Sequence, residues 1–240
     1  MFATLMYHII SNKITDKIAV AEDAFAAQLR YLSNNGYSIL SMNQVVNMIR
    51  GSEVVPARSI LITFDDGYSD NVYTALPHLQ RFGMTAALFM ISAFVGQTNR
   101  WNPRACYDSN HLTWEELQVW LDAGCELGGH THTHLCMNRL NELEMRETVS
   151  LNKRVLEERL HVQLHAFSYP YGRYNVLAKT IVREYYDIAF CVDEGYWDPK
   201  MDGYAINRLG VSPKWDINEF AERLNNLFSQ FEVNVPRATG

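Results

Sequence analysis

Two pairs of residues in this sequence have the side chains and the spacing for hydrolytic chemistry. Asp65 and Asp66 are adjacent at the end of the apolar stretch SILITF, although neighbouring carboxylates repel and a turn needs at most one acid. His130 and His134 are four residues apart, a spacing that on a helical turn places both rings on one face, about 5–6 Å apart at Cβ. With one carboxylate, they would form a site with open positions for zinc, iron, cobalt or nickel.

A divalent metal would explain why two carboxylates stand side by side. Successive side chains at a strand end point in different directions, so one aspartate can bind the ion while its neighbour takes a proton from bound water. Zinc lowers the pKa of bound water from 15.7 to about 7–9. Gly67 follows directly and permits the sharp turn that this arrangement requires. The residues alone leave open which aspartate has which role.

The elements that must position these residues follow a βα pattern. Short apolar runs alternate with longer amphipathic ones along the chain, which predicts a parallel barrel or a doubly wound sheet. In either fold, ligands bind at the carboxyl ends of the strands. The expected strands are Thr4–Ile9, Ser59–Phe64, Thr85–Met90, Glu126–Gly129, His165–Tyr169, Ile188–Val192 and Ala205–Leu209.

Three helices have recognisable sequence signals. Ser41–Gln44 and Thr113–Glu116 match the capping box at a helix start. Asn141–Leu160 is the longest helical segment, with apolar residues at helical spacing. Ser92–Asn110 is the one loop long enough to form a lid or a wall for a substrate.

Composition and charge exclude several classes of function. The chain of 240 residues has a net charge of −6, which argues against a protein that binds nucleic acid. No apolar run reaches the roughly 20 residues of a transmembrane helix, and the N-terminus lacks the pattern of a signal peptide. The four cysteines include no CxxC pair. These features predict a cytoplasmic protein without a transmembrane segment, and they do not indicate its oligomeric state.

Three motifs resemble those of a known family. TFDDG (Thr63–Gly67), HTHTH (His130–His134) and YPYG (Tyr169–Gly172) resemble the polysaccharide deacetylases, nodulation-type carbohydrate esterases that remove acetyl groups from N-acetylglucosamine. The resemblance extends over about Met6–Val211. It implies an α/β fold, a distorted (β/α) barrel of about seven parallel strands, in a single catalytic domain over residues 1–240.

The resemblance also implies roles for individual residues. Asp65 would be the general base, and Asp66, His130 and His134 would bind one divalent metal, with zinc expected first. The backbone amide of Tyr171 would help to stabilise the oxyanion. His132 falls on a position that does not bind metal in the family.

The departures from the family pattern concern the residues around the base. Ser168 stands where the family has an arginine that positions the catalytic aspartate, and Arg208 is a candidate substitute. The stretch INRLGV (Ile206–Val211) lacks the histidine that serves as general acid. His8, in a YH segment like that of the poly-β-1,6-N-acetylglucosamine deacetylases, is the candidate acid in this chain.

The predicted function is that of a metal-dependent hydrolase. It would remove the N-acetyl group from an N-acetylated sugar or oligosaccharide, giving acetate and a free amine. A related barrel amidohydrolase that opens a cyclic imide or ureide is the main alternative. An iron oxygenase and a carbohydrate-binding protein without activity are two others, and the paired aspartates argue against both.

Overall fold

The computed structural model describes residues 1–54, 56–99 and 109–234. Its strands are β1 (Phe2–Tyr7), β2 (Ile9–Ile10), β3 (Ala19–Val20), β4 (Ser38–Ile39), β5 (Ser59–Asp66), β6 (Ala87–Met90), β7 (Glu126–Gly129), β8 (Ala166–Ser168), β9 (Ile188–Phe190), β10 (Tyr196–Trp197) and β11 (Leu209–Gly210). Its α-helices are α1 (Glu22–Asn34), α2 (Met42–Ile49), α3 (Leu76–Arg81), α4 (Trp114–Asp122), α5 (Glu142–Leu160), α6 (Val176–Tyr185) and α7 (Ile217–Asn234). Short helical segments are η1 (Asn71–Ala75), η2 (Ser92–Phe94), η3 (Met137–Arg139) and η4 (Pro170–Gly172).

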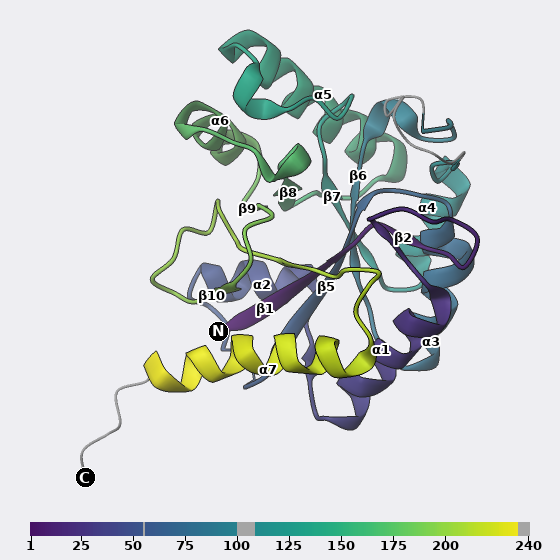
Figure 1. Ribbon diagram of the computed structural model, residues 1–240. Helices are drawn as coiled ribbons and strands as arrows, with labels where there is room; N and C mark the ends of the chain where they lie inside the picture. The colour runs from purple at the N-terminus through teal and green to yellow at the C-terminus, as the bar shows by residue number, and fades with distance from the viewer. Residues whose placement is uncertain (55, 100–108, 235–240) are drawn as a thin grey trace.

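A curled sheet forms the centre of the molecule (Figure 1). Its strands follow the order β10-β1-β5-β6-β7-β8-β9, with β4 beside β5 and β11 beside β1. All of these pairings are parallel except that of β1 with β10. A bridge between Phe190 and Ile206 extends the sheet beyond β9. The predicted α/β fold, a distorted barrel, is confirmed, with an antiparallel edge strand that the sequence did not indicate.

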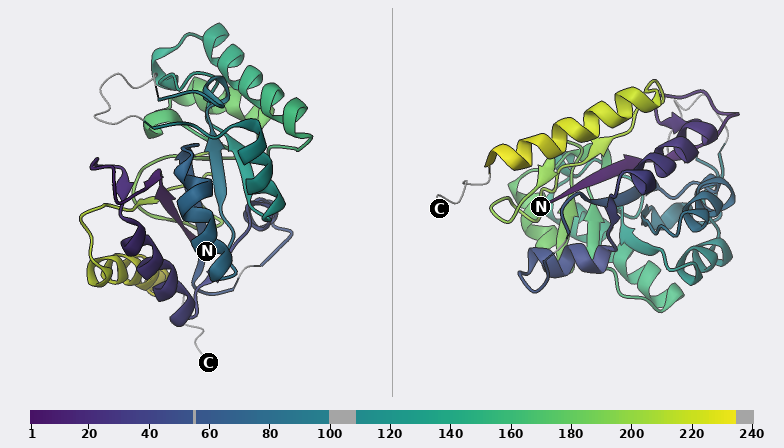
Figure 2. Two further views of the ribbon diagram at one scale, coloured as in Figure 1. Left: turned by 90° about the vertical axis from the view of Figure 1, so that its right-hand side faces the viewer. Right: turned by 90° about the horizontal axis from the view of Figure 1, so that it is seen from below.

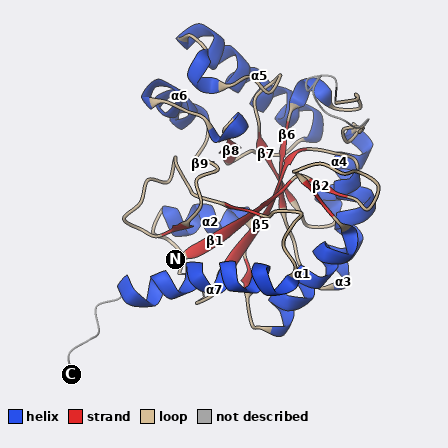
Figure 3. Cartoon of the chain, viewed as in Figure 1, coloured by secondary structure: helices blue, strands red, loops and turns tan. Residues whose placement is uncertain are grey.

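Helices cover the outer face of this sheet (Figure 3). Phe64 on β5 points outward, where its ring contacts Phe25 of α1 and Trp120 of α4 at centroid distances of 5.9 and 5.8 Å. Helix α7 packs against α1 and lies close to β1 in the view from below (Figure 2). None of the described helices has both the length and the apolar character needed to cross a membrane.

The inner face of the sheet has its own apolar cluster. Phe2, Leu61, Phe89 and Phe190 are fully buried there, and the rings of Phe89 and Phe190 lie 5.4 Å apart. Leu61 of β5 points inward. Because strand side chains alternate between the two faces, Thr63 and Asp65 on the same strand point inward as well. Strand β5 therefore delivers Asp65 to the inside of the barrel.

Several expected boundaries are confirmed and one strand is not. The capping boxes at Ser41 and Thr113 are both present, and α5 begins directly after its N-cap Asn141. The expected strand Ala205–Leu209 is wrong except for its last residue, because β11 is Leu209–Gly210. Part of the loop expected to form a substrate wall, residues 100–108, lies outside the described residues.

Candidate active site

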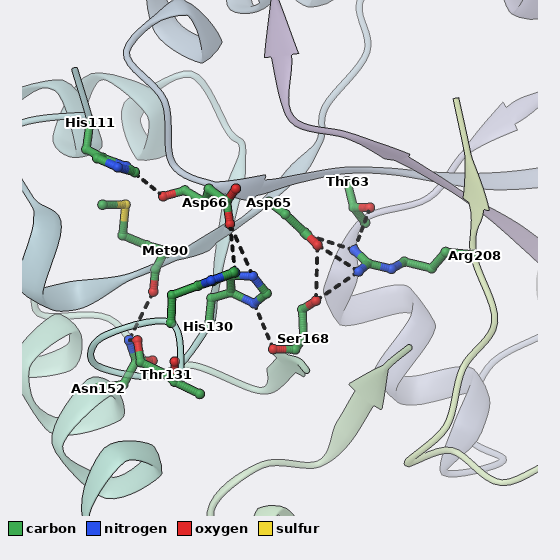
Figure 4. Close-up of polar contacts among 11 residues, drawn as sticks. Thr63, Asp65, Asp66, Met90, His111, His130, Thr131, Asn152, Ser168 and Arg208 are labelled. Atoms are coloured by element: carbon green, nitrogen blue, oxygen red, sulfur yellow. Dashed lines mark hydrogen bonds and ion pairs between the residues drawn. The ribbon is translucent and has the colours of Figure 1, made fainter. Parts of the chain in front are cut away.

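The two aspartates end β5 with different backbone conformations and so face different partners (Figure 4). Asp65 follows the regular alternation into the barrel, whereas Asp66 has a φ of 73°, which turns its side chain away from the outward position that alternation would give it. Both residues are buried, at 3% and 2% exposure. Gly67 continues the turn with a φ of 81°, and a Cβ there would lie 2.1 Å from Met90 Sδ. The expected need for glycine at this position is confirmed.

Asp65 is held by an arginine from the other end of the chain. Arg208 is fully buried and donates from Nη1 and Nη2 to the two oxygens of Asp65, each at 2.7 Å. Ser168 Oγ accepts a bond of 2.9 Å from Arg208 and donates to Asp65 at 3.3 Å. Burial disfavours the charged carboxylate, but Arg208 outweighs burial and holds the pKa of Asp65 below its ordinary value. The arginine therefore keeps this carboxylate ionised and fixed in orientation.

Arg208 reaches Asp65 from an irregular segment and not from a strand end. The segment lies between the Ile206 bridge and β11, and Arg208 Nε donates to the Cys191 carbonyl at 2.8 Å. Its guanidinium carbon lies 5.6 Å from the ring centre of Phe89 and 5.9 Å from that of Phe190. These contacts place the arginine on top of the inner apolar cluster, beside Asp65.

Asp66 lies between two histidine rings. The Nε2 atoms of His130 and His134 are each 3.3 Å from Asp66 Oδ1, and the three candidate ligand atoms lie within 4.8 Å of one another. All three side chains are buried. Burial disfavours the Asp66 carboxylate, yet the two histidines hold its pKa well below the ordinary value.

The hydrogen bonds of this cluster fit a bound cation. His130 Nδ1 lies 2.7 Å from the Ser168 carbonyl, which can only accept, so Nδ1 carries a proton. In the neutral form of His130 that a metal ion needs as its ligand, the Nε2 lone pair then faces Asp66 Oδ1 at 3.3 Å, and this buried oxygen has no other hydrogen-bond partner among the described residues. A positive charge between nitrogen and oxygen removes this repulsion, and a metal ion also uses both atoms as ligands.

The two histidines meet through a loop, which corrects the expected helical turn. Residues 130–134, here named the histidine loop, contain no helix, and Thr131 and His134 have φ values of 63° and 58°. Asn152 of α5 donates to the Thr131 carbonyl at 2.7 Å and to the Met90 carbonyl at 3.0 Å. This buried amide ties the histidine loop to the end of β6.

His132 lies apart from the metal cluster, as expected. Its Nδ1 is 2.9 Å from Ser92 Oγ, and its backbone N–H donates to the Thr148 carbonyl. His111 was not anticipated, because nothing near it in the sequence suggests a role. Its Nδ1 donates to the Asp66 carbonyl at 3.0 Å, which supports the unusual backbone conformation of that residue.

The remaining candidates also lie at this end of the barrel. His8 connects β1 and β2, and its charge is near enough to lower the pKa of Asp65 and Asp66, where burial acts in the opposite direction. Its carbonyl accepts a bond of 2.8 Å from Asn71. The ring of Tyr171 lies 4.6 Å from that of His134 in an edge-on arrangement. The structure thus brings all seven sequence-predicted residues to one site.

Comparison with known proteins agrees with the fold and the motifs. The family model described as polysaccharide deacetylase matches residues 52–186. The protein YxkH of Bacillus subtilis (strain 168) is 30% identical over 224 residues, which cover 93% of this chain and 76% of that protein. The chain belongs to the polysaccharide deacetylase family. The resemblance found from the sequence motifs is therefore confirmed, and the family is one of carbohydrate deacetylases.

More distant relatives extend the same picture. The poly-beta-1,6-N-acetyl-D-glucosamine N-deacetylase of Escherichia coli (strain K12) is 23% identical, and the match covers 93% of this chain but 38% of that protein. Among solved structures, the deacetylase PplD of Streptococcus pyogenes in complex with acetate has a TM-score of 0.81 at 23% identity and covers 93% of this chain and 97% of its own. IcaB from Ammonifex degensii has a TM-score of 0.82 at 22% identity and covers 93% and 95%. These two proteins and this chain share one fold.

Proposed function

We propose that this protein is a metal-dependent hydrolase that removes the acetyl group from an N-acetylated amino sugar or glycan, releasing acetate and a free amine. One observation carries the proposal: two adjacent buried carboxylates have different partners, Asp66 facing two histidines and Asp65 facing Arg208. Family membership supports the reaction. The name of the Escherichia coli relative supports N-acetylglucosamine units as the substrate.

Asp66, His130 and His134 would hold the metal. One carboxylate oxygen and two imidazole nitrogens suit zinc, with iron, cobalt or nickel as alternatives. When bound, such an ion supplies a Lewis acid for the acetyl carbonyl and lowers the pKa of water. The ligand atoms already lie within 4.8 Å of one another, so binding requires little rearrangement of the chain.

Three further residues would carry the proton transfers and stabilise charge. Asp65, kept ionised by Arg208, accepts a proton from the attacking water as general base. His8 delivers a proton to the departing nitrogen, because an amine anion is a poor leaving group. The backbone N–H of Tyr171 donates to the oxyanion that forms as water adds to the carbonyl.

Metal analysis and acetate release test this proposal together. Asp66→Ala, His130→Ala and His134→Ala should each lose most of the bound metal in elemental analysis, whereas His132→Ala, the matched control from the same loop, should retain it. Asp65→Asn should retain metal and lose about 10²–10⁴ in turnover, the usual contribution of a positioned general base.

Three results would contradict the assignment. The first is a wild-type protein that holds no divalent ion after reconstitution, and the second is a His132→Ala variant that alone loses the metal. The third is near wild-type turnover in Asp65→Asn. Ring opening of a cyclic imide without acetate release would favour the amidohydrolase alternative, which rests on two departures from the family pattern, the absent arginine beside the base and the absent histidine in Ile206–Val211. Arg208 contacts Asp65 directly, which removes the first of these two reasons.

A further inference from the structure

A cavity of about 720 Å³ opens beside the candidate metal site. Its lining includes the metal-ligand candidate His134 and the ring of Tyr171, which is 55% exposed. Because ligand pockets for small molecules are usually about 300–1,000 Å³, this space is large enough for a sugar unit next to the one that reacts. A substrate that enters the metal site through this cavity would pass Tyr171.

Two arginines from separate elements line the same cavity. Arg139 ends η3 and Arg173 directly follows η4. Both side chains are exposed. Burial raises the pKa of Tyr171, and the charge of Arg139 opposes that rise, which places this arginine close to the tyrosine. Two positive charges therefore face the space through which a substrate would reach the metal.

Neither arginine is neutralised by a described carboxylate. On α5 and α6, Arg146 contacts Glu142 and Glu184, and Arg183 contacts Asp202, whereas Arg154 forms no ion pair with a described residue. Arg139 and Arg173 differ from Arg154 because they line the cavity beside the candidate metal site. The protein as a whole has more acidic than basic residues, with a net charge of −6, yet no described carboxylate forms an ion pair with either of these two arginines. A neutral glycan could accept hydrogen bonds from these arginines through its hydroxyl and acetamido oxygens, but it carries no charge to offset theirs.

We propose that this cavity binds an anionic substituent, a carboxylate or a phosphate, carried by the sugar next to the N-acetylated unit. Arginine presents a planar fork of donors that matches either group, and two such forks lining one cavity favour a negatively charged ligand. The inference rests on the proposed deacetylase function and adds a substrate class to it: a charged N-acetylated glycan and not a neutral homopolymer.

Two measurements on the metal-loaded protein test this subsite. The first compares kcat/KM for acetate release from a neutral N-acetylglucosamine tetramer and from matched oligomers that carry one carboxylate or one phosphate on the neighbouring sugar. Wild type should prefer a charged oligomer, and Arg139→Gln/Arg173→Gln should reduce this preference by about 10–100-fold, mainly through KM, since hydrogen bonds to charged groups have about this strength. Arg154→Gln, which removes an exposed charge on α5 outside the cavity, should keep the wild-type preference.

The second measurement is binding of the same charged oligomers without their acetyl groups, by calorimetry, which needs no turnover. The Arg139→Gln/Arg173→Gln variant should bind them about 10–100-fold more weakly, and the stronger of the carboxylate and phosphate effects identifies the group. The subsite would be overturned if the variant and wild type showed the same kcat/KM preference for charged over neutral oligomers. It would also be overturned if both proteins bound the charged oligomers equally tightly. Absence of acetate release from every oligomer, with the binding difference intact, would instead overturn the deacetylase function alone.

Discussion

Arg208→Met should lower the free energy of unfolding by about 3–5 kcal/mol, the usual cost of leaving one member of a buried ion pair without its partner. Asp65 is 3% exposed and Arg208 is fully buried, and both of their hydrogen bonds measure 2.7 Å. Methionine occupies much of the space against Phe89 and Phe190, so loss of the charge pair and not a cavity dominates the change. For a chain of this size, about 2–4 °C per kcal/mol converts the loss to a fall in Tm of about 6–20 °C.

Urea denaturation followed by circular dichroism, on metal-free protein, measures this loss. A double-mutant cycle with Asp65→Asn isolates the pair, and we expect a coupling of about 2 kcal/mol or more, within the range for contacting residues. Arg208→Lys keeps the charge but not the two-pronged geometry, so its stability should fall between those of wild type and Arg208→Met. Additivity of the two single changes to within about 0.5 kcal/mol would refute the coupling that the structure indicates.

Three other predictions concern proton delivery, loop geometry and pH. His8→Ala should keep its metal and lose about 10²–10⁴ in turnover on an amide but much less on an activated ester, and an equal loss on both substrates would indicate a structural role. Asn152→Ala removes both hydrogen bonds that tie the histidine loop to β6, and metal affinity in a chelator competition should fall about 10–100-fold; unchanged affinity would contradict the positioning role. Burial raises the pKa of Asp70 to about 7, so the stability that the folded state gains from the neutral carboxyl is full below about pH 4 and is lost as pH rises through about 7. Asp70→Asn should therefore show a smaller fall in the free energy of unfolding between these pH values than wild type. Urea midpoints of the two proteins that change with pH in parallel would contradict this prediction.

Much of the site could be predicted from the sequence because strand alternation and chain order constrain it strongly. An apolar strand that ends in two aspartates leaves few ways to place them, and β5 delivers Asp65 inward as the pattern requires. The candidate ligands His130 and His134 could likewise be identified from their spacing and motif. The backbone conformation that brings the two histidines together could not be predicted. Thr131 has a left-handed conformation, and no local sequence pattern specifies that conformation for a residue other than glycine.

The supporting residues were harder to identify because their roles depend on tertiary contacts. Asn152 lies in a helix rich in charged residues, where one buried amide has no distinctive signal. Arg208 was expected at a strand end, yet it reaches Asp65 from an irregular segment whose position depends on closure of the barrel. Sequence patterns describe local preferences, whereas these contacts depend on which distant elements pack together.

The sequence separation of 143 between Asp65 and Arg208 also limits the order in which this region can fold during protein synthesis. At about 5–20 residues per second, a ribosome completes β5 about 7–28 s before it adds Arg208. Throughout that interval the Asp65 carboxylate lacks Arg208, the buried cation that pairs with it, so we expect the inner face of the sheet to stay hydrated. We also expect the segment between β9 and β11 to close the barrel as a late step. A nascent chain stalled before residue 208 should therefore expose Phe89 and Phe190 and be a ready target for chaperones and proteases.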